Sequence, residues 1–229
     1  IATRHQLHGS LVLEALKSGK HVLVEKPLTL RKEELISLQD FYNEGIADNK
    51  IRSKPILLTG YNRRFSPYVR RMQKLLEKRV APFIMNYRMN AGFIPLDHWV
   101  HGQEGGGRNL GEACHIYDLF TCLADSKVVS LSAQAVKPTT KHYARNDNFV
   151  ATISFADGSV ANLIYTALGH KDISKEKAEL YVDGKIAVLD DYKSLSVYGA
   201  KNISLQTRLQ EKGLMIELEH FAKGIQTGE

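Results

Sequence analysis

The feature that most constrains the fold is a short apolar run that ends in a charged pair followed by proline. Residues 22–24 are Val-Leu-Val, and Glu25, Lys26 and Pro27 come directly after them. An apolar run without alternation is typical of a strand buried on both faces of a parallel sheet. Because ligands of open α/β sheets bind outside the carboxyl ends of strands, this order predicts a functional corner at Lys26. A strand end with solvated charges is the alternative.

The flanking segments predict a βαβ arrangement around this strand. Residues 1–3 read as the end of an earlier strand, helices are expected over residues 8–18 and 32–43, and a third buried strand over residues 55–61. Together they predict the second half of a doubly wound, dinucleotide-binding sheet over residues 1–60. No Gly-x-Gly-x-x-Gly sequence occurs. We therefore expect a fragment without the pyrophosphate-binding turn.

From residue 61 onward the pattern changes to many short strands and a few helices. Strands are expected over residues 83–89, 128–137, 148–155, 159–168, 177–182 and 185–190, with edge strands within 192–204. Helices are expected over residues 68–78, 109–124 and 210–226. Asp157-Gly158 and Asp183-Gly184 are two-residue turns, which predict two antiparallel hairpins. Residues 61–229 are thus expected to form a second domain.

Composition and charge exclude several classes of protein. The chain is 43% hydrophobic and 24% charged, and no apolar run approaches the roughly 18 residues needed to span a bilayer. Cys114 and Cys122 lack metal-ligand spacing, so we expect no metal site and a reducing, cytoplasmic location. The formal charge is +6, but the basic residues are scattered and no aromatic series accompanies them. Binding to nucleic acid or to a membrane is therefore not expected.

Three groups indicate chemistry: Lys26, the Asn-Arg-Arg-Phe corner at residues 62–65, and His115. His115 lies on a predicted helix that begins just after the glycines at residues 105–107. Such glycines allow a backbone to approach a ligand closely, and a histidine placed there can act as a general base near neutral pH. Glu112, three residues earlier, could orient the imidazole. The competing interpretation is a core histidine with satisfied hydrogen bonds.

These motifs resemble the Gfo/Idh/MocA oxidoreductase family. The resemblance is carried by Gly-Lys-His-Val-Leu-Val-Glu-Lys-Pro-Leu at residues 19–28, by Gly-Tyr-Asn-Arg-Arg-Phe-Ser-Pro at residues 60–67, and by the stretch from Gly105 to His115. It implies an α/β and α+β fold: the C-terminal half of a Rossmann-like doubly wound sheet, then a domain with a large, mainly antiparallel sheet. That second domain is expected to bind a carbohydrate substrate and to form a homo-oligomer through its sheet.

The resemblance also implies roles for individual residues. Lys26 would stabilise the developing alkoxide, and His115 would remove the hydroxyl proton as hydride leaves for the nicotinamide of NAD or NADP. The residues expected to bind the cofactor are Thr3, His5, His8, Glu25, Lys26, Pro27 and Arg64. Those expected to bind the substrate are Asn90, His98, Trp99 and Glu112.

Two features qualify the resemblance. Many members have an aspartate four residues before the catalytic histidine, where this chain has Gly111 followed by Glu112. It is therefore open whether a carboxylate of this helix binds the substrate. Residues 88–92, 98–99 and 105–115 also resemble one branch, the oxidoreductase half of fusions with a zinc-type alcohol-dehydrogenase module.

The expected function is an NAD(P)-dependent oxidoreductase. It would transfer hydride between a nicotinamide cofactor and a hydroxyl of a sugar, a sugar nucleotide or a related polyol. The chain alone is expected to be incomplete and inactive, since affinity for the pyrophosphate depends largely on the Gly-rich turn and its helix. Two alternatives stay open: an NAD-dependent glycosidase of the same fold, and a cofactor-free module for substrate binding and oligomerisation.

Overall fold

The computed structural model describes residues 1–47 and 55–228, which form two compact units. Unit 1 is built from Ile1–Tyr61, Asp97–Cys114 and Met215–Glu229, and unit 2 from Asn62–Leu96 and His115–Leu214. Each unit therefore combines stretches that are far apart in the sequence. The division into contiguous domains at residues 1–60 and 61–229 stays a prediction.

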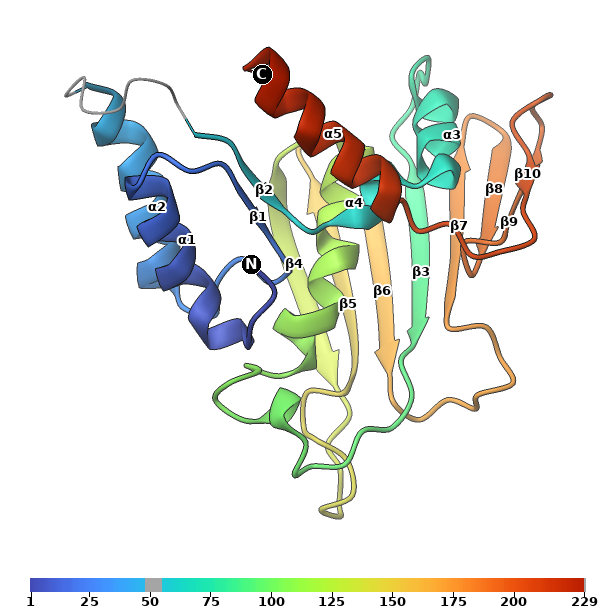
Figure 1. The fold of residues 1–229 in the computed structure, drawn as a ribbon. Coiled ribbons are helices and arrows are strands. Elements are labelled where there is room, and N and C mark those ends of the chain that lie inside the picture. The colour runs from blue at the N-terminus through green and yellow to red at the C-terminus, as the bar shows by residue number, and fades with distance from the viewer. Residues whose placement is uncertain (48–54, 229) are drawn as a thin grey trace. The chain divides into compact units, whose positions relative to one another are not determined.

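Unit 1 contains the parallel strand pair that the sequence predicts (Figure 1). β1 (Val22–Val24) and β2 (Leu57–Thr59) are parallel. The helices α1 (His8–Lys17) and α2 (Lys32–Ala47) precede and follow β1 in the chain. The core of this part is a cluster of buried side chains: Val12, Leu16, Val22, Val24 and Leu38. The apolar run before Glu25 is thus a buried strand, as expected.

The other elements of unit 1 come from later in the chain. They are the 3₁₀ turn η3 (Trp99–His101), the π-helix η4 (Asn109–Ala113) and nearly all of α5 (Leu214–Thr227). The short 3₁₀ turn η1 (His5–Leu7) leads into α1. The helix predicted over residues 109–124 is thus π-helical at its start and becomes α-helical only in α4 (Cys114–Ala124). Such π-turns are frequent at functional sites.

Unit 2 is an eight-stranded sheet of order β10-β9-β8-β7-β3-β6-β5-β4. Its strands are β3 (Ile84–Asn90), β4 (Val128–Ala135), β5 (Asn148–Phe155), β6 (Val160–Thr166), β7 (Glu176–Val182), β8 (Lys185–Asp190), β9 (Ser194–Tyr198) and β10 (Leu205–Gln206). Only the β3–β6 pair is parallel; every other neighbouring pair in this sheet is antiparallel. The predicted large, mainly antiparallel sheet is confirmed.

Both predicted hairpins are present, as β5–β6 and β7–β8. In the second turn Asp183 and Gly184 have φ angles of 47° and 71°, the left-handed geometry that a tight turn between twisted strands requires. In the first turn Gly158 has a φ of 88°, but the Phe155 N–H donates to the Ser159 carbonyl at 2.9 Å, so the loop comprises residues 156–158 and is not the predicted two-residue turn. Turn chemistry that is local in the sequence therefore predicted these pairings correctly.

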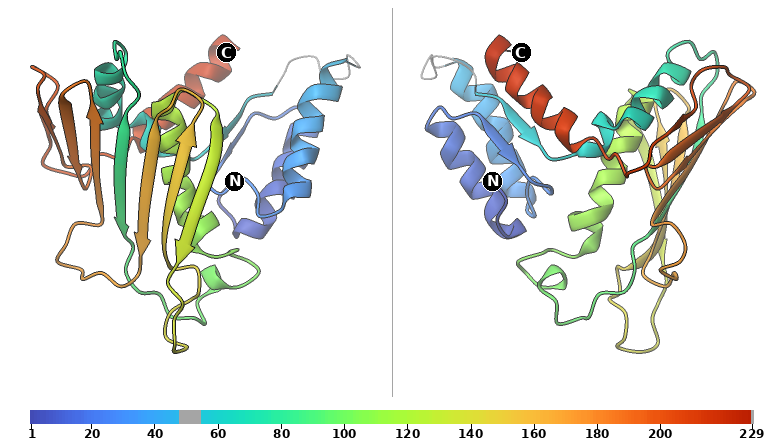
Figure 2. Two further views of the ribbon diagram at one scale, coloured as in Figure 1. Left: turned by 180° about the vertical axis from the view of Figure 1, so that it is seen from behind. Right: turned by 45° about the vertical axis from the view of Figure 1, so that its right-hand side comes forward.

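One face of the unit 2 sheet is covered by helices (Figure 2). α3 (Pro67–Leu76) and α4 lie on this face, and alternate β3 residues, Met85, Tyr87 and Met89, are buried. On the opposite face Ile84 is exposed. Among the described elements of unit 2, no helix covers that face. Ser66 caps the N-terminus of α3: its Oγ accepts a hydrogen bond from the Tyr68 backbone N–H at 3.3 Å.

Buried charge in unit 2 is concentrated around Glu176. This carboxylate accepts two hydrogen bonds from the Arg63 guanidinium, at 2.8 and 2.9 Å, one from the Tyr87 hydroxyl at 2.5 Å and one from the Lys212 ammonium at 2.6 Å. Glu176 is fully buried. Burial alone would raise its pKa, but the charge and hydrogen bonds of Arg63 and Lys212 outweigh burial and lower the pKa to about 2.

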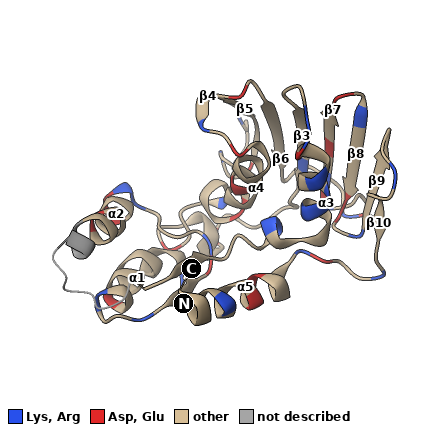
Figure 3. Cartoon of the chain, turned by 90° about the horizontal axis from the view of Figure 1, so that it is seen from above, with Lys and Arg blue, Asp and Glu red and all other residues tan. Residues whose placement is uncertain are grey.

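The remaining charges are dispersed. Lys and Arg (blue) and Asp and Glu (red) are interspersed over the elements of both units (Figure 3). In the described part of the chain, no helix combines the length and apolarity needed to cross a lipid bilayer.

Candidate functional site

Lys26 lies two residues beyond the carboxyl end of β1, and its peptide bond to Pro27 is cis. Its ammonium donates a hydrogen bond of 2.5 Å to the carbonyl oxygen of Gly111 in η4, and the bond is partly buried. Among the described residues this is the one hydrogen bond of the ammonium. Since a lysine carries three N–H donors, two remain for a ligand oxygen. The corner predicted at Lys26 is therefore capable of binding a polar group.

The glycine segment before η4 packs tightly against its own unit. A Cβ atom at Gly111 would lie 2.9 Å from Cε1 of His5, and one at Gly106 would lie 2.6 Å from Cδ2 of Leu30. Gly106 and Gly107 have φ angles of 70° and 84°, which favour glycine. Close packing and left-handed backbone thus account for these glycines. Their close approach to a ligand stays a prediction.

His8 is fully buried and holds the proline corner. Its Nδ1 lies 2.8 Å from the carbonyl oxygen of Pro27, and its Nε2 lies 3.1 Å from the carbonyl oxygen of Thr3. Thr3 and Glu25 are themselves exposed. His8 therefore fixes the backbone next to Lys26, and the predicted contact of these residues with a cofactor stays a prediction.

His5 connects the start of the chain to the glycine segment. Its Nδ1 lies 2.9 Å from the carbonyl oxygen of Gly105, and its ring meets the Trp99 ring edge to face at 4.9 Å. Burial lowers the pKa of His5, partly opposed by the hydrogen bond to Gly105, and the positive charge of Lys26 lowers it further. His5 thus lies close enough to Lys26 for their charges to interact.

Trp99 is held in a small stack within unit 1. The Arg4 guanidinium lies over the Trp99 ring, 4.2 Å from its centroid, and pairs with Glu104 at 3.4 Å. The Nδ1 of His98 accepts the backbone N–H of Val100 at 3.3 Å, which caps η3. Sequence reasoning missed Arg4, and no local motif indicated it, because its partners lie about a hundred residues away.

Glu112 has a partner that was not foreseen. The guanidinium of Arg108 donates to the Glu112 carboxylate at 3.1 Å, and Arg108 is almost completely buried. The spacing i, i+4 between opposite charges on one helix could have indicated this pair. The proposed action of Glu112 on His115 or on a substrate stays a prediction.

The remaining site candidates lie in unit 2. His115 is buried and is the first unit 2 residue of α4. Arg64 donates two hydrogen bonds to the Asp118 carboxylate, one of them at 2.9 Å from Nε. Burial raises the pKa of Asp118 despite this pairing. Lys26 and His115 thus belong to different units, and their action in one site stays a prediction.

The side chain of Asn90, at the end of β3, is hydrogen-bonded to backbone carbonyl groups of the loop that follows β6. Its Nδ2 donates to the carbonyl oxygens of His170 and Ile173, at 2.8 and 3.3 Å. A Cβ atom at Gly169 would collide with the Asn90 carboxamide. Asn90 therefore clamps the loop that follows β6, and its predicted contact with a substrate is untested.

Within residues 1–47 and 55–228, no group of three or more His, Cys, Asp or Glu side chains is arranged to hold a metal ion. Among the described residues, neither Cys114 nor Cys122 forms a disulfide bond.

Comparison with known families decides the relationship. Residues 1–45 match the GFO_IDH_MocA model, described as an oxidoreductase family with an NAD-binding Rossmann fold, and residues 83–227 match its C-terminal alpha/beta domain. The chain belongs to the Gfo/Idh/MocA oxidoreductase family. The match to the first model covers only part of a dinucleotide domain.

The family relatives are distant dehydrogenases. The chain is 25% identical to scyllo-inositol 2-dehydrogenase (NAD(+)) of Bacillus subtilis over 246 residues, which cover all of this chain and 67% of that protein. It is 29% identical to 1-carboxy-3-chloro-3,4-dihydroxycyclohexa-1,5-diene dehydrogenase of Comamonas testosteroni over 181 residues, covering 74% of this chain and 42% of that protein. The chain thus spans only part of these Gfo/Idh/MocA relatives.

Solved structures share the fold of this chain. A UDP-N-acetylglucosamine 3-dehydrogenase from Acidithiobacillus ferrooxidans superposes with a TM-score of 0.77 at 22% identity, over 99% of this chain and 68% of that one. Levoglucosan dehydrogenase in complex with NADH and levoglucosan gives 0.76 at 21% identity, over 100% and 70%.

Proposed function

We propose that the chain is part of an NAD(P)-dependent oxidoreductase that transfers hydride between a nicotinamide cofactor and a hydroxyl of a sugar, a sugar nucleotide or a related polyol. The observation that carries the proposal is the Lys26 ammonium at the end of β1, hydrogen-bonded to the Gly111 carbonyl at 2.5 Å and with two donors left over. Family membership and the names of the relatives support this reaction class.

Lys26 has the chemistry that oxidation of a hydroxyl needs. As the hydroxyl loses its proton and hydride, negative charge develops on its oxygen, and a cation already in place stabilises that charge. The partner of Lys26 is a neutral carbonyl, so the positive charge of the ammonium is not neutralised by it. β1 and the contact of His8 with the Pro27 carbonyl fix the backbone position from which the Lys26 side chain extends.

His115 is proposed as the general base. An imidazole changes its protonation near neutral pH, so it can take the hydroxyl proton and return it in the reverse direction. A bound nicotinamide cofactor would supply the hydride acceptor. Thr3, His5, His8, Glu25, Pro27 and Arg64 are proposed to hold that cofactor, and Asn90, His98, Trp99 and Glu112 to hold the substrate.

The function is tested by incubating the full-length enzyme that contains this chain with NAD⁺ or NADP⁺ and a panel of inositols, levoglucosan and UDP-sugars. Net formation of NADH or NADPH with at least one of them is expected. Hydrolysis of a glycoside without net NADH would favour the glycosidase alternative and contradict the proposal. Calorimetric titration with NAD⁺ tests the separate expectation that this chain alone binds the cofactor poorly, which micromolar binding would contradict.

We also propose that the uncovered face of the unit 2 sheet joins copies of the chain. Ile84, Val150 and Ile164 on β3, β5 and β6 are exposed, and Val150 lies opposite Ile164 in the sheet. Exposed apolar side chains on an uncovered sheet face are typical of an interface. Light scattering should therefore report an oligomer, and Ile164→Lys should dissociate it. A monomeric wild-type protein would contradict this.

A further inference from the structure

The two edges of the unit 2 sheet differ in length and in protection. One edge is β10, which has only two residues, and the other is β4, which has eight. Every residue of β4 is exposed, and its sequence, Val-Val-Ser-Leu-Ser-Ala-Gln-Ala, contains no charged residue and no proline. Edge strands of monomeric proteins are usually kept short, or carry charges, prolines or bulges that prevent pairing with another strand. β4 therefore has less protection against such pairing than β10.

A bulge interrupts β4 only near its start. The register with β5 shifts between Val128 and Ser130, which is typical of a bulge. From Ser130 to Ala135 each residue lies opposite one residue of β5 in a regular antiparallel register. Residues 130–135 thus form a straight edge.

The hydrogen bonds between β4 and β5 indicate which backbone groups of β4 point away from the sheet. The Val136 N–H, directly after β4, donates to the Asn148 carbonyl oxygen at 2.9 Å. In an antiparallel pair, residues that bond to the partner strand alternate with residues whose N–H and C=O point to the other side. Leu131, Ala133 and Ala135 therefore turn their N–H and C=O groups to the free edge.

These three residues are placed symmetrically about Ala133. When a second copy of β4 lies antiparallel with Ala133 opposite Ala133, Leu131 of each copy comes opposite Ala135 of the other. All the outward N–H and C=O groups of the three residues then meet outward groups of the second copy, as in the directly opposed, hydrogen-bonded pairs of an antiparallel sheet. The edge is thus self-complementary, as a twofold interface between identical chains requires.

The side chains leave room for a second strand. Leu131 lies opposite Ile153 of β5, on the face of the sheet where the Ile153 side chain is buried. Leu131 itself is 62% exposed, so no described element of the chain covers it. Its partner in the second copy would be the small Ala135. Pairing would therefore bury apolar surface of Leu131 without a clash, and such burial favours association.

The charge of the edge favours a neutral partner. Lys127 and Lys137 flank β4, and the residues between them carry no charge. Antiparallel pairing about Ala133 therefore opposes no like charges along the strand, which would destabilise a sheet. A charged partner strand would find no counter-charge there. A second copy of β4 meets this condition, because it is itself neutral.

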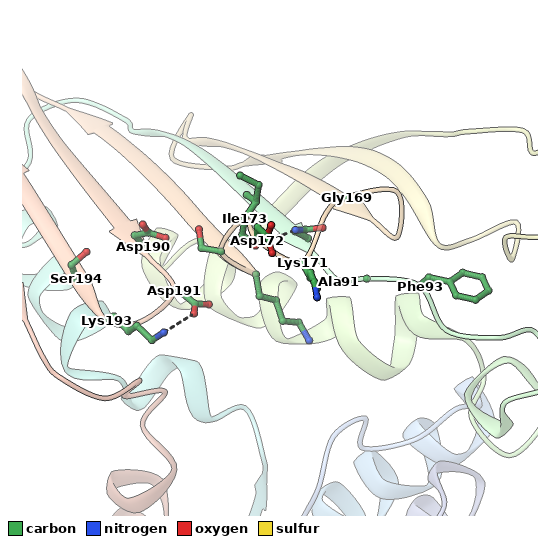
Figure 4. Close-up of a pocket in the computed structure, with 14 residues that line it drawn as sticks. Ala91, Phe93, Gly169, Lys171, Asp172, Ile173, Asp190, Asp191, Lys193 and Ser194 are labelled. Atoms are coloured by element: carbon green, nitrogen blue, oxygen red, sulfur yellow. Dashed lines mark hydrogen bonds and ion pairs between the residues drawn. The ribbon is translucent and has the colours of Figure 1, made fainter.

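Pairing at this edge leaves a large cavity of unit 2 unobstructed. The cavity has a volume of about 740 Å³, and its walls come from residues 90–93, 169–175 and 190–194 (Figure 4). None of its lining residues belongs to β4, and two strands, β6 and β5, separate β3 from β4 in the sheet.

We propose that β4 pairs with β4 of a second copy of the chain, antiparallel and with Ala133 at the twofold axis, so that two eight-stranded sheets become one continuous sheet. The inference goes beyond the proposed joining of copies through the uncovered sheet face, because it uses backbone groups at the edge and different residues. A protein that uses both contacts is a tetramer with dihedral symmetry.

The test measures the mass of the full-length protein that contains this chain by light scattering. Ala133→Lys places two lysines opposite each other at the axis, and Ala133→Glu places two glutamates there, so each variant should have half the mass of the wild type. An equimolar mixture of the two variants places Lys opposite Glu and should recover the wild-type mass. Two variants that had merely lost their fold would not restore each other.

Hydrogen–deuterium exchange, followed by mass spectrometry, locates the contact. Peptides spanning residues 130–136 should exchange more slowly as the protein concentration rises, because the outward N–H groups become bonded. Ala133→Pro removes an N–H that points away from β5, so it should fold as the wild type does and lose this protection. Gln206→Lys, exposed on the edge strand β10, is the matched control and should keep both the mass and the protection.

Three outcomes would overturn the proposal. They are wild-type mass in folded Ala133→Lys and Ala133→Glu, a mixture of these variants that stays at half the mass, and fast exchange of residues 130–136 at every concentration. Ile164→Lys tests the uncovered face alone and should leave the protection of residues 130–136 in place. A failure of that other contact is therefore distinguishable from a failure of the β4 pairing.

Discussion

Lys26 in unit 1 and Glu176 in unit 2 are charged side chains at strand ends, but their surroundings differ. Glu176 is completely buried and accepts four hydrogen bonds, three of the donor atoms being charged nitrogens of Arg63 and Lys212. Lys26 is partly buried and makes one hydrogen bond, to a neutral carbonyl, among the described residues. Removing one partner of a buried charge whose hydrogen bonds are all made within the protein is strongly destabilising, whereas an incompletely bonded charge is available to a ligand.

The largest effect should come from removing the Lys26 ammonium. In the full-length enzyme that contains this chain, Lys26→Met is expected to lower turnover by about 10²–10⁴-fold in the assay for NADH formation, the range for loss of a group that stabilises transition-state charge. The circular dichroism spectrum of the variant should match that of the wild type, which would show that the fold is unchanged. Lys20→Met, in the exposed turn before β1, is the matched control and should retain full turnover. Unchanged turnover in Lys26→Met would contradict the view that Lys26 serves a ligand whereas Glu176 serves the fold.

Glu176→Gln should instead act on stability. It leaves the buried Arg63 without its counter-charge, which costs about 3–5 kcal/mol in the free energy of unfolding. Chemical denaturation followed by circular dichroism measures this value. Glu77→Gln, at the exposed residue that follows α3 in the same unit, should change stability by less than about 0.5 kcal/mol. Equal effects of the two variants would show that the buried network contributes little.

Acid should weaken unit 2 through the same carboxylate. The pKa of Glu176 is lowered from its usual 4.5 to about 2 in the folded state, so its contribution is present above pH 4.5 and is lost as the pH falls toward 2. The loss amounts to about 3 kcal/mol if the whole shift counts. Denaturation at a series of pH values should show this decline in the wild type, and a smaller one in Glu176→Gln. Parallel declines in both proteins would contradict the assignment.

The smallest effect concerns His5, beside the Lys26 site. Burial lowers the pKa of His5 below 6.5, so the folded state favours the neutral ring. Its contribution to stability is therefore present above pH 6.5 and decreases as the pH falls through the lowered pKa. An NMR titration of the imidazole, assigned with His5→Gln, should give a midpoint below 6.5. A midpoint at or above that value would show that water reaches the ring.

Local sequence was sufficient for much of the fold. The Val-Leu-Val run predicted a buried parallel strand, and Asp157-Gly158 and Asp183-Gly184 predicted both hairpins. These features depend on side chains and backbone angles within a few residues, so they can be read without knowing the rest of the chain. The π-helical start before α4 was not predicted, because propensity does not distinguish one extra residue in a helical turn.

Long-range partners could not be predicted. Arg63 and Glu176 are 113 positions apart, Lys26 and Gly111 are 85 apart, and the cavity joins three separated stretches. The parallel pairing of β3 with β6 likewise joins distant segments. No local pattern specifies which remote group will meet a given side chain, since many pairings satisfy the same hydrophobic periodicity.

The sequence by itself determined that a lysine follows a buried strand and is turned by proline, because these are consequences of neighbouring residues. Only the tertiary structure decided that the Lys26 ammonium, among the described residues, donates to a glycine carbonyl and not to a carboxylate. It likewise decided that Glu176 accepts hydrogen bonds from both Arg63 and Lys212. Burial and hydrogen-bond satisfaction depend on which distant segments pack together, and that is settled by the free energy of the whole fold.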